Sequence, residues 1–285
     1  MNNETKGTIA ITALSILWGT AAIAIRALSN YGVGVPAQLF FGAIAGCIFI
    51  LALYGKKVEI IPKKENLKWL IILGMFSGIT AITFFYAAIF TKIAYLEFLH
   101  YTMPLWVFLL AAFWLKEKIT AWKLLALLLA IMGISLIFHG GAGIDLTNVG
   151  NVLALLSAVS YAGMTVIGRK LKDTEQQTSV FWTFFIGIFV ALPLFILHNE
   201  ISLIGIVLIS LYTLVEGIGG YLLYYYALRN IEASKASIIL LIETVFASLF
   251  AWMLFGETLT ALNIAGGLLI LTGAAIVIRK TKWSI

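Results

Sequence analysis

The segment AAFWLKEKITA at residues 111–121 returns 140 positions later as AWMLFGETLTA at residues 251–261. Around both segments, residue types that are scarce in this chain keep the same spacing. The matched residues are Tyr86 and Tyr226, Glu117 and Glu257, Thr120 and Thr260, and Gly133 and Gly273. A second match, shifted by 143, pairs Gly7 with Gly150, Trp18 with Tyr161 and Arg26 with Arg169. The chain therefore reads as two copies of one unit, residues 1–143 and 144–285.

Composition assigns the chain to the membrane. Hydrophobic residues make up 62% of the 285 residues and charged residues 11%, and the mean hydropathy is +1.04. Such a chain cannot cover itself with a solvated surface, so it must lie in lipid. The net charge of +6 does not indicate nucleic-acid binding, because the cations are scattered among short loops. The single cysteine, Cys47, excludes an internal disulfide.

Ten apolar runs are each close to the roughly 20 residues that a helix needs to cross about 30 Å of hydrocarbon. The predicted spans are residues 7–28, 36–54, 68–90, 94–115, 120–138, 148–168, 178–197, 203–228, 235–255 and 260–278. Lipid offers no partner for an unpaired backbone group, so each span is predicted to be helical. The predicted fold class is all-α integral membrane.

Lysine and arginine placement predicts the orientation, because cytoplasmic loops are enriched in both. With the N-terminus inside, all of the 19 cationic residues except Arg26 and Lys92 fall in inner segments. Ten spans then put both termini in the cytoplasm, in a multi-pass protein of the cytoplasmic membrane. Each copy holds five spans, an odd number, so the second copy is inverted. Inverted repeats are the geometric basis of alternating access in transporters.

Several features occur together: the ten spans, Trp18 and Gly19 in the first, Pro104 in the fourth, and FGETLT at residues 255–260. In these features the chain resembles the drug/metabolite transporter superfamily, EamA type, over essentially its whole length. The resemblance implies that four helices of each half surround a central cavity and that the fifth packs peripherally, where it can form homodimer contacts. It also implies export of small metabolites, commonly amino acids. The family's proline after a ninth-span glutamate is replaced here by Thr244, which leaves open the kink that the resemblance implies there.

Two glutamates lie deep in predicted spans. Glu216 is near the middle of the eighth span, and Glu243 is about 12 Å from the inner end of the ninth at 1.5 Å per residue. A charge near the bilayer centre costs about 2.5–3.5 kcal/mol on insertion scales, so such carboxyls are candidates for proton coupling. The alternative is that each is a hydrogen-bonded structural glutamate.

A polar stripe on the fourth span supplies further candidates. Glu97, His100 and Tyr101 follow the i, i+3, i+4 spacing of one helix face. His100 could bind a carboxylate or relay a proton, or it could simply cap Glu97. Glu97 lies only about one turn inside the span, so it is assigned to gating or to structure.

Aromatic residues within the spans that the resemblance assigns to the cavity are predicted to bind substrate. They are Trp18, Tyr86, Tyr161, Tyr221 and Tyr224, with Tyr101 and His100 from the polar stripe, and Gln38 and Thr165 as weaker polar candidates. Ring faces with hydroxyl groups suit an amphipathic metabolite, although they also suit plain packing.

Glu117 and Glu257 end the fourth and ninth spans. They are predicted either to cap helices and brace one conformation or to act as gates.

The sequence disfavours catalysis. It carries no intramembrane nucleophile with a base, no paired aspartates, no metal cluster and no Walker loop. We therefore predict no enzymatic activity and no cofactor, and as partners a small-molecule substrate and membrane lipid. The predicted function is secondary active export. The alternatives are a passive facilitator or channel, and uptake or exchange of a phosphorylated or nucleoside-like metabolite.

Overall fold

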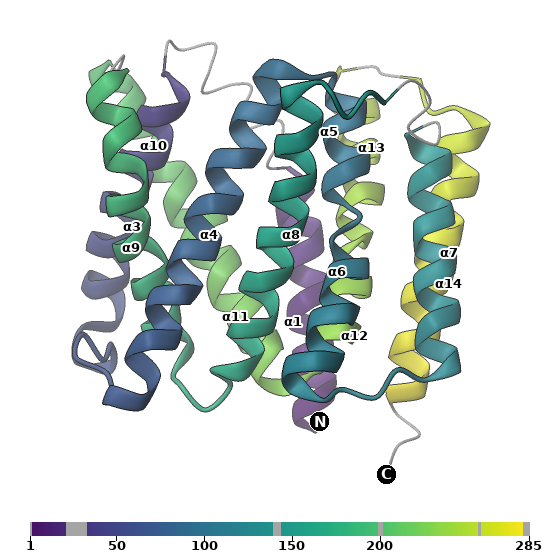
Figure 1. The fold of residues 1–285 in the computed structure, drawn as a ribbon, viewed down its shortest axis with the longest axis horizontal. Helices are drawn as coiled ribbons and strands as arrows, with labels where there is room; N and C mark the ends of the chain where they lie inside the picture. The colour runs from purple at the N-terminus through teal and green to yellow at the C-terminus, as the bar shows by residue number, and fades with distance from the viewer. Residues whose placement is uncertain (1, 21–32, 139–143, 199–201, 256–257, 282–285) are drawn as a thin grey trace.

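The computed structural model is built from helices throughout the residues that it describes, 2–20, 33–138, 144–198, 202–255 and 258–281 (Figure 1). The α-helices are α1 (Asn3–Trp18), α3 (Val35–Tyr54), α4 (Lys64–Phe90), α5 (Ile93–His100), α6 (Met103–Leu110), α7 (Ala121–Ile137), α8 (Val149–Lys170), α9 (Gln176–Leu197), α10 (Leu203–Tyr212), α11 (Gly220–Asn230), α12 (Ala233–Leu240), α13 (Ile242–Phe255) and α14 (Ala261–Thr281). Two π-helical segments, η2 (Ala111–Leu115) and η4 (Thr213–Gly219), and one 3-10 turn, η1 (Gly55–Lys57), join them.

These helices form the ten predicted spans, and the fold class is confirmed. Within the described residues, eight stretches are long and apolar enough to cross a membrane, and α7 is a shorter apolar helix. The remaining span contains α1. Three spans are composite in the part of the chain that the structure describes: α5, α6 and η2 make the fourth, α10, η4 and α11 make the eighth, and α12 and α13 make the ninth. The start of α1 and the end of α14 lie at the same end of the bundle, as an even number of spans requires (Figure 1).

The two halves pack against each other as inverted copies. Helix α4 of the first half packs on α8 of the second, and α11 of the second packs on α1 of the first. Helices α3 and α9 pair on one side of the bundle, and α7 and α14 pair at the opposite side (Figure 1). The fifth helix of each half is therefore peripheral, and the homodimer contact through it stays a prediction.

The close contacts of glycine residues repeat in the two halves with the same spacing of 140 residues. A Cβ added to Gly133 would lie 2.5 Å from the carbonyl oxygen of Gly266. The equivalent pair, 140 residues away, is Gly273 and Ala126, and there the added Cβ would lie 2.7 Å from the carbonyl oxygen of Ala126. Small residues let transmembrane helices approach this closely, so the duplicated spacing in the sequence corresponds to duplicated packing.

The fourth and ninth spans are both interrupted near their middles. In the fourth, the helix breaks at residues 101–102, shortly before Pro104. In the ninth, it breaks at Leu241, although the family's proline is absent. Thr244 replaces the proline there, and both its hydroxyl and its backbone N–H donate to the carbonyl of Leu241, over 2.8 and 3.1 Å. A threonine that bonds back to its own helix bends it, and Glu243 consequently begins α13.

The close contact between α7 and α14 predicts that a larger residue at position 133 will destabilise the protein. We expect Gly133→Ala to lower the free energy of unfolding by about 1–3 kcal/mol, because the new methyl group overpacks against backbone. Gly219→Ala is the matched control, since its Cβ would meet only the Leu214 carbonyl oxygen at 3.9 Å. Thermal unfolding of the purified variants in detergent checks this, and equal melting temperatures for the two would contradict it.

Candidate functional site

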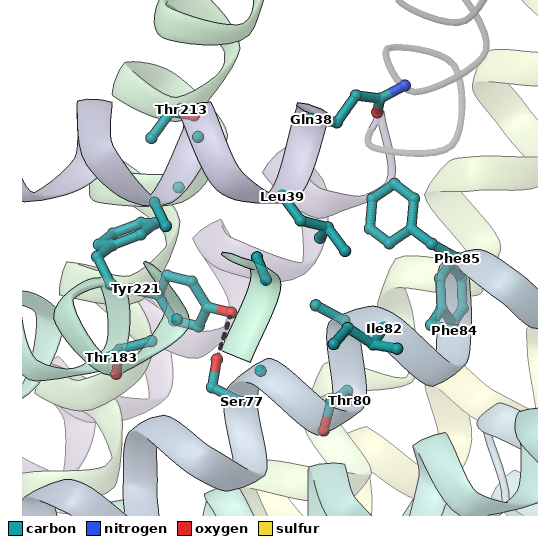
Figure 2. A pocket seen from close by; sticks show the side chains of 18 of the residues that line it. Gln38, Leu39, Ser77, Thr80, Ile82, Phe84, Phe85, Thr183, Thr213 and Tyr221 are labelled. Atoms are coloured by element: carbon teal, nitrogen blue, oxygen red, sulfur yellow. Dashed lines mark hydrogen bonds between the residues drawn. The ribbon is translucent and has the colours of Figure 1, made fainter. Parts of the chain in front are cut away.

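A cavity of about 280 Å³ lies between the two halves (Figure 2). Its walls include the second half of α4, the middle of α9 and the first half of α3, so it lies in the part of the bundle away from the start of α1. Most of the wall is apolar. The lining residues with polar or aromatic groups include Trp18, Gln38, Ser77, Thr80, Phe84, His100, Tyr161, Thr183, Phe184, Tyr212, Thr213, Glu216, Tyr221 and Glu243.

Glu216 enters the cavity wall from the π-helical segment η4. Its residue is 7% exposed, and its Oε1 accepts a hydrogen bond from the Thr20 hydroxyl. The indole Nε1 of Trp18 donates to the Glu216 backbone carbonyl over 3.0 Å. An extra residue in a π turn alters side-chain direction and often marks a functional site, and here the first span fixes that turn.

Glu243 lines the same cavity from the start of α13. The Tyr101 hydroxyl donates to its Oε1 over 3.2 Å, and Glu97 and Glu216 lie within electrostatic reach of it. Tyr101 and Glu97 are not among the described lining residues. Tyr101 instead packs on Phe138 and holds the Glu243 carboxyl from behind.

His100 lines the cavity at the end of α5, where the fourth span breaks. Its Nδ1 lies 2.8 Å from the Ser157 hydroxyl oxygen. Its ring meets Phe84 at 4.7 Å and Tyr161 at 5.6 Å between centroids, both edge to face. The histidine is thus fixed between the two halves.

The predicted aromatic residues divide into two groups. Trp18, Tyr161 and Tyr221 line the cavity, and the Tyr221 hydroxyl lies 3.2 Å from that of Ser77, as Figure 2 shows. Tyr224 is 1% exposed and lies behind the wall, with its hydroxyl 2.6 Å from that of Thr165. Tyr86 stacks on Phe90 and is not among the described lining residues.

Sequence reasoning missed several hydroxyl groups in or beside the cavity. Ser77 and Thr183 line it, and Thr20 holds Glu216. One signal was available, because Ser77, Thr80 and Phe84 follow the i, i+3, i+7 spacing of one face of a long apolar helix.

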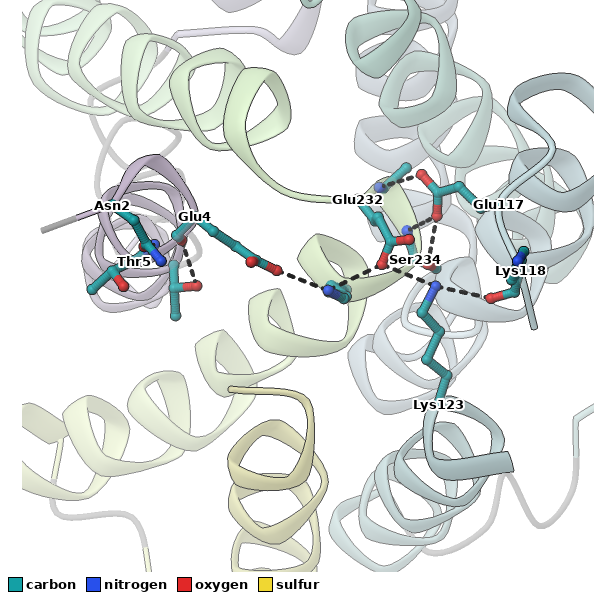
Figure 3. A network of polar contacts seen from close by, with 11 residues as sticks. Asn2, Glu4, Thr5, Glu117, Lys118, Lys123, Glu232 and Ser234 are labelled. Carbon is teal, nitrogen blue, oxygen red and sulfur yellow. Dashed lines mark hydrogen bonds and ion pairs between the residues drawn. The ribbon is translucent and has the colours of Figure 1, made fainter. Parts of the chain in front are cut away.

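A polar network, which we call the end latch, ties the two halves together at the end where α1 begins (Figure 3). Glu117 accepts from the Ala233 and Ser234 backbone N–H groups over 2.8 and 3.1 Å and from the Ser234 hydroxyl. It thereby caps α12, as an acceptor at a helix N-terminus does. The ion pairs of the latch are Lys123 with Glu232 at 3.0 Å, Lys235 with Glu4 at 2.8 Å and Lys235 with Glu232 at 3.2 Å.

Charge pairing controls the ionisation of the latch. Partial burial acts to raise the pKa of Glu232, but the neighbouring Lys123 and Lys235 outweigh it and hold that pKa below its ordinary value. The carboxylate therefore stays charged at neutral pH. Glu257, the predicted gate of the opposite end, lies outside the described residues.

Ten helical spans in two inverted repeats, with a largely apolar cavity that carries two carboxyls and an end latch that joins the two halves, define a membrane transporter. The EamA-like transporter family model matches twice, over residues 5–139 and 148–279. The chain belongs to that family, whose members are transporters and not enzymes.

The similar proteins match most of the chain or nearly all of it. The riboflavin transporter ImpX of Fusobacterium nucleatum is 25% identical over 95% of this chain and 97% of its own. The pseudopaline exporter CntI of Pseudomonas aeruginosa is 26% identical over 86% of each chain. A solved crystal structure with 18% identity superimposes with a TM-score of 0.78 over 98% of both chains, which shows the fold alone.

The end latch predicts how a change at Glu117 will act. Replacing Glu117 by Ala removes the cap of α12, and we expect the free energy of unfolding to fall by about 1–2 kcal/mol. Residue 237 is 1% exposed in the native protein. In a Cys47→Ser background, we therefore also expect a maleimide to label Ser237→Cys several times faster when residue 117 is Ala than when it is Glu. Glu65→Ala, at the exposed start of α4, is the control. Unchanged labelling would show that Glu117 does not hold this end closed.

The latch should be insensitive to pH across the neutral range. The pKa of Glu232 in the folded protein lies below its unfolded value, which is about 4.3 for glutamate. The charged carboxylate therefore stabilises the fold fully above the unfolded pKa, and this stabilisation is lost as the pH falls through the folded pKa. We therefore expect Ser237→Cys labelling, measured relative to Glu65→Cys, to stay constant from about pH 8 to about pH 5. A rise within that window would assign a titrating group to the latch.

Proposed function

We propose that the protein is a secondary active transporter that exports small metabolites, amino acids and related compounds among them, across the cytoplasmic membrane by alternating access. Both termini lie in the cytoplasm in this proposal, in accord with the lysine and arginine placement. Protons taken up by Glu216 and Glu243 drive the export.

One observation carries the proposal: two membrane-depth carboxyls line one cavity between two inverted repeats. Their charges repel each other at this depth, where water does not screen them. A proton or a cationic group relieves the repulsion. Either one can therefore occupy the cavity only at the expense of the other, and that competition couples a proton gradient to the movement of a solute.

The inverted repeats supply the second conformation. The cavity lies away from the end latch, so this conformation corresponds to an outward-facing state if the termini are cytoplasmic. Exchanging the shapes of the two halves would open the latch end and close the other. The breaks beside His100 and Glu243 lie at the cavity wall, where the fourth and ninth spans could bend during that exchange.

The relatives support both the class of solute and the direction of transport. One is named a riboflavin transporter and another an exporter. Each name describes a small organic molecule, which accords with a cavity of about 280 Å³. The predominantly apolar wall with a few fixed polar groups is also typical of sites for such molecules.

Substitution of the two carboxyls tests the proposal. A thermal-shift screen of amino acids, nucleosides and organic cations first identifies a solute. In proteoliposomes with an imposed pH gradient, Glu243→Gln and Glu216→Gln should each reduce gradient-driven transport at least tenfold while solute binding stays measurable, because an amide cannot carry the proton. Glu65→Gln should behave as the unmodified protein.

Unchanged gradient-driven flux in both cavity variants would reject proton coupling by these carboxyls. Downhill flux without counterflow would instead indicate a passive facilitator.

A further inference from the structure

The charges on the described cavity wall have one sign. Glu216 and Glu243 line the cavity, and no lysine or arginine occurs among the described lining residues. The described residues also include no group of three or more His, Cys, Asp or Glu side chains that could hold a metal ion. A cation that balances these carboxylates must therefore come with the solute or as a proton.

Glu216 offers an unused acceptor. Its Oε1 is occupied by the Thr20 hydroxyl, whereas its Oε2 is buried and has no hydrogen-bond partner among the described residues. A buried carboxylate oxygen without a donor is costly, because it has lost water and gained nothing in return. This carboxyl is therefore satisfied only when a proton or a hydrogen-bond donor reaches Oε2.

His100 adds a second acceptor. When the Ser157 hydroxyl donates its one hydrogen to the Ala154 carbonyl, over 2.6 Å, Nδ1 of His100, 2.8 Å from that hydroxyl oxygen, is the donor of the contact. In a neutral imidazole the other nitrogen, Nε2, is then an acceptor. In this tautomer His100, which lines the cavity, carries a group suited to an N–H donor and unsuited to a carboxylate.

Aromatic rings stand beside the acceptors. Trp18, whose indole is fixed by the Glu216 carbonyl, meets the ring of Tyr221 edge to face at 5.7 Å, and Tyr221 meets Phe184 in the same way at 5.7 Å. Such faces bind apolar and aromatic bodies and attract a cation held close to them. The cavity volume, about 280 Å³, is near the lower limit of roughly 300–1,000 Å³ for ligand pockets, which suits a body of one or two rings.

We infer that, within the proposed function as a transporter, the cavity selects organic amines: small aromatic or apolar molecules with an ammonium group and no carboxylate. The ammonium donates to Glu216 Oε2 and to the acceptors nearby, and the ring packs on Trp18 and Tyr221. An α-amino acid meets the same acceptors with its ammonium, but its carboxylate finds no cationic partner on the described wall and faces two carboxylates. The selected class is therefore the amine, which narrows the proposed function and sets aside the amino acids named there.

Matched ligands test this inference on the purified full chain. Tryptamine, tryptophan and N-acetyltryptamine share one ring system, but only the first combines an ammonium with the absence of a carboxylate. We expect calorimetric titration to give tryptamine at least tenfold tighter binding than either of the others. Glu216→Gln should weaken tryptamine binding at least tenfold and leave N-acetyltryptamine unchanged, and Glu65→Gln should change neither.

The outcomes separate this inference from the proposed function. If tryptophan or N-acetyltryptamine binds as tightly as tryptamine to the unmodified protein, the preference for amines is overturned, and this comparison needs no variant to fold. Counterflow of those solutes in proteoliposomes would then leave the transporter proposal intact. Counterflow that is absent for every compound of the thermal-shift screen would overturn the transporter proposal itself.

Discussion

A carboxylate inside a bilayer finds no water to bind, and the site depends on how this chain meets that constraint. Insertion of such a charge costs about 2.5–3.5 kcal/mol on insertion scales, so it persists only where the protein supplies partners. Thr20 and Trp18 provide them for Glu216, and Tyr101 provides one for Glu243. Both carboxyls line the space between the two halves. The position of these carboxyls at the cavity and the presence of their partners on neighbouring helices both follow from the need to stabilise a carboxylate in lipid.

Close packing makes that arrangement possible without a hydrophobic driving force between helices. In lipid, helices associate through shape and hydrogen bonds, and here glycines bring backbones into contact at symmetric positions. Gly133 meets Gly266 as Gly273 meets Ala126, and Gly7 meets Asn230 as Gly150 meets Phe90. The peripheral pair α7 and α14 and the central pairs α1 with α11 and α4 with α8 are thus held by repeated contacts. The cavity lies between these contacts, where the side chains of the two halves do not fill the space.

The sequence was sufficient for the architecture because hydropathy, cationic loops and the 140-residue repeat are properties of composition and spacing. For the same reason it predicted that Glu216 and Glu243 lie within spans, and the structure has them in η4 and α13. It did not predict which face of a helix a side chain takes when the helix is interrupted. Tyr224 lies behind the wall, in the helix α11 that follows the π segment η4. The break at Leu241 depends on a threonine hydroxyl and not on a proline, and the role of Thr20 requires a contact across 196 residues. No local pattern contains such information.

The duplication copied the fold but not the charges of the end latch. At the equivalent positions of the opposite end, Glu4, Lys123, Glu232 and Lys235 are replaced by Thr147, Asn263, Lys92 and Tyr95. Three ion pairs thus brace one end, and the equivalent positions at the other end offer a single cation. In the proposed alternating-access cycle, two mirror-related shapes of the same backbone would therefore differ in electrostatic energy, because of latch residues at one end of the bundle, away from the cavity.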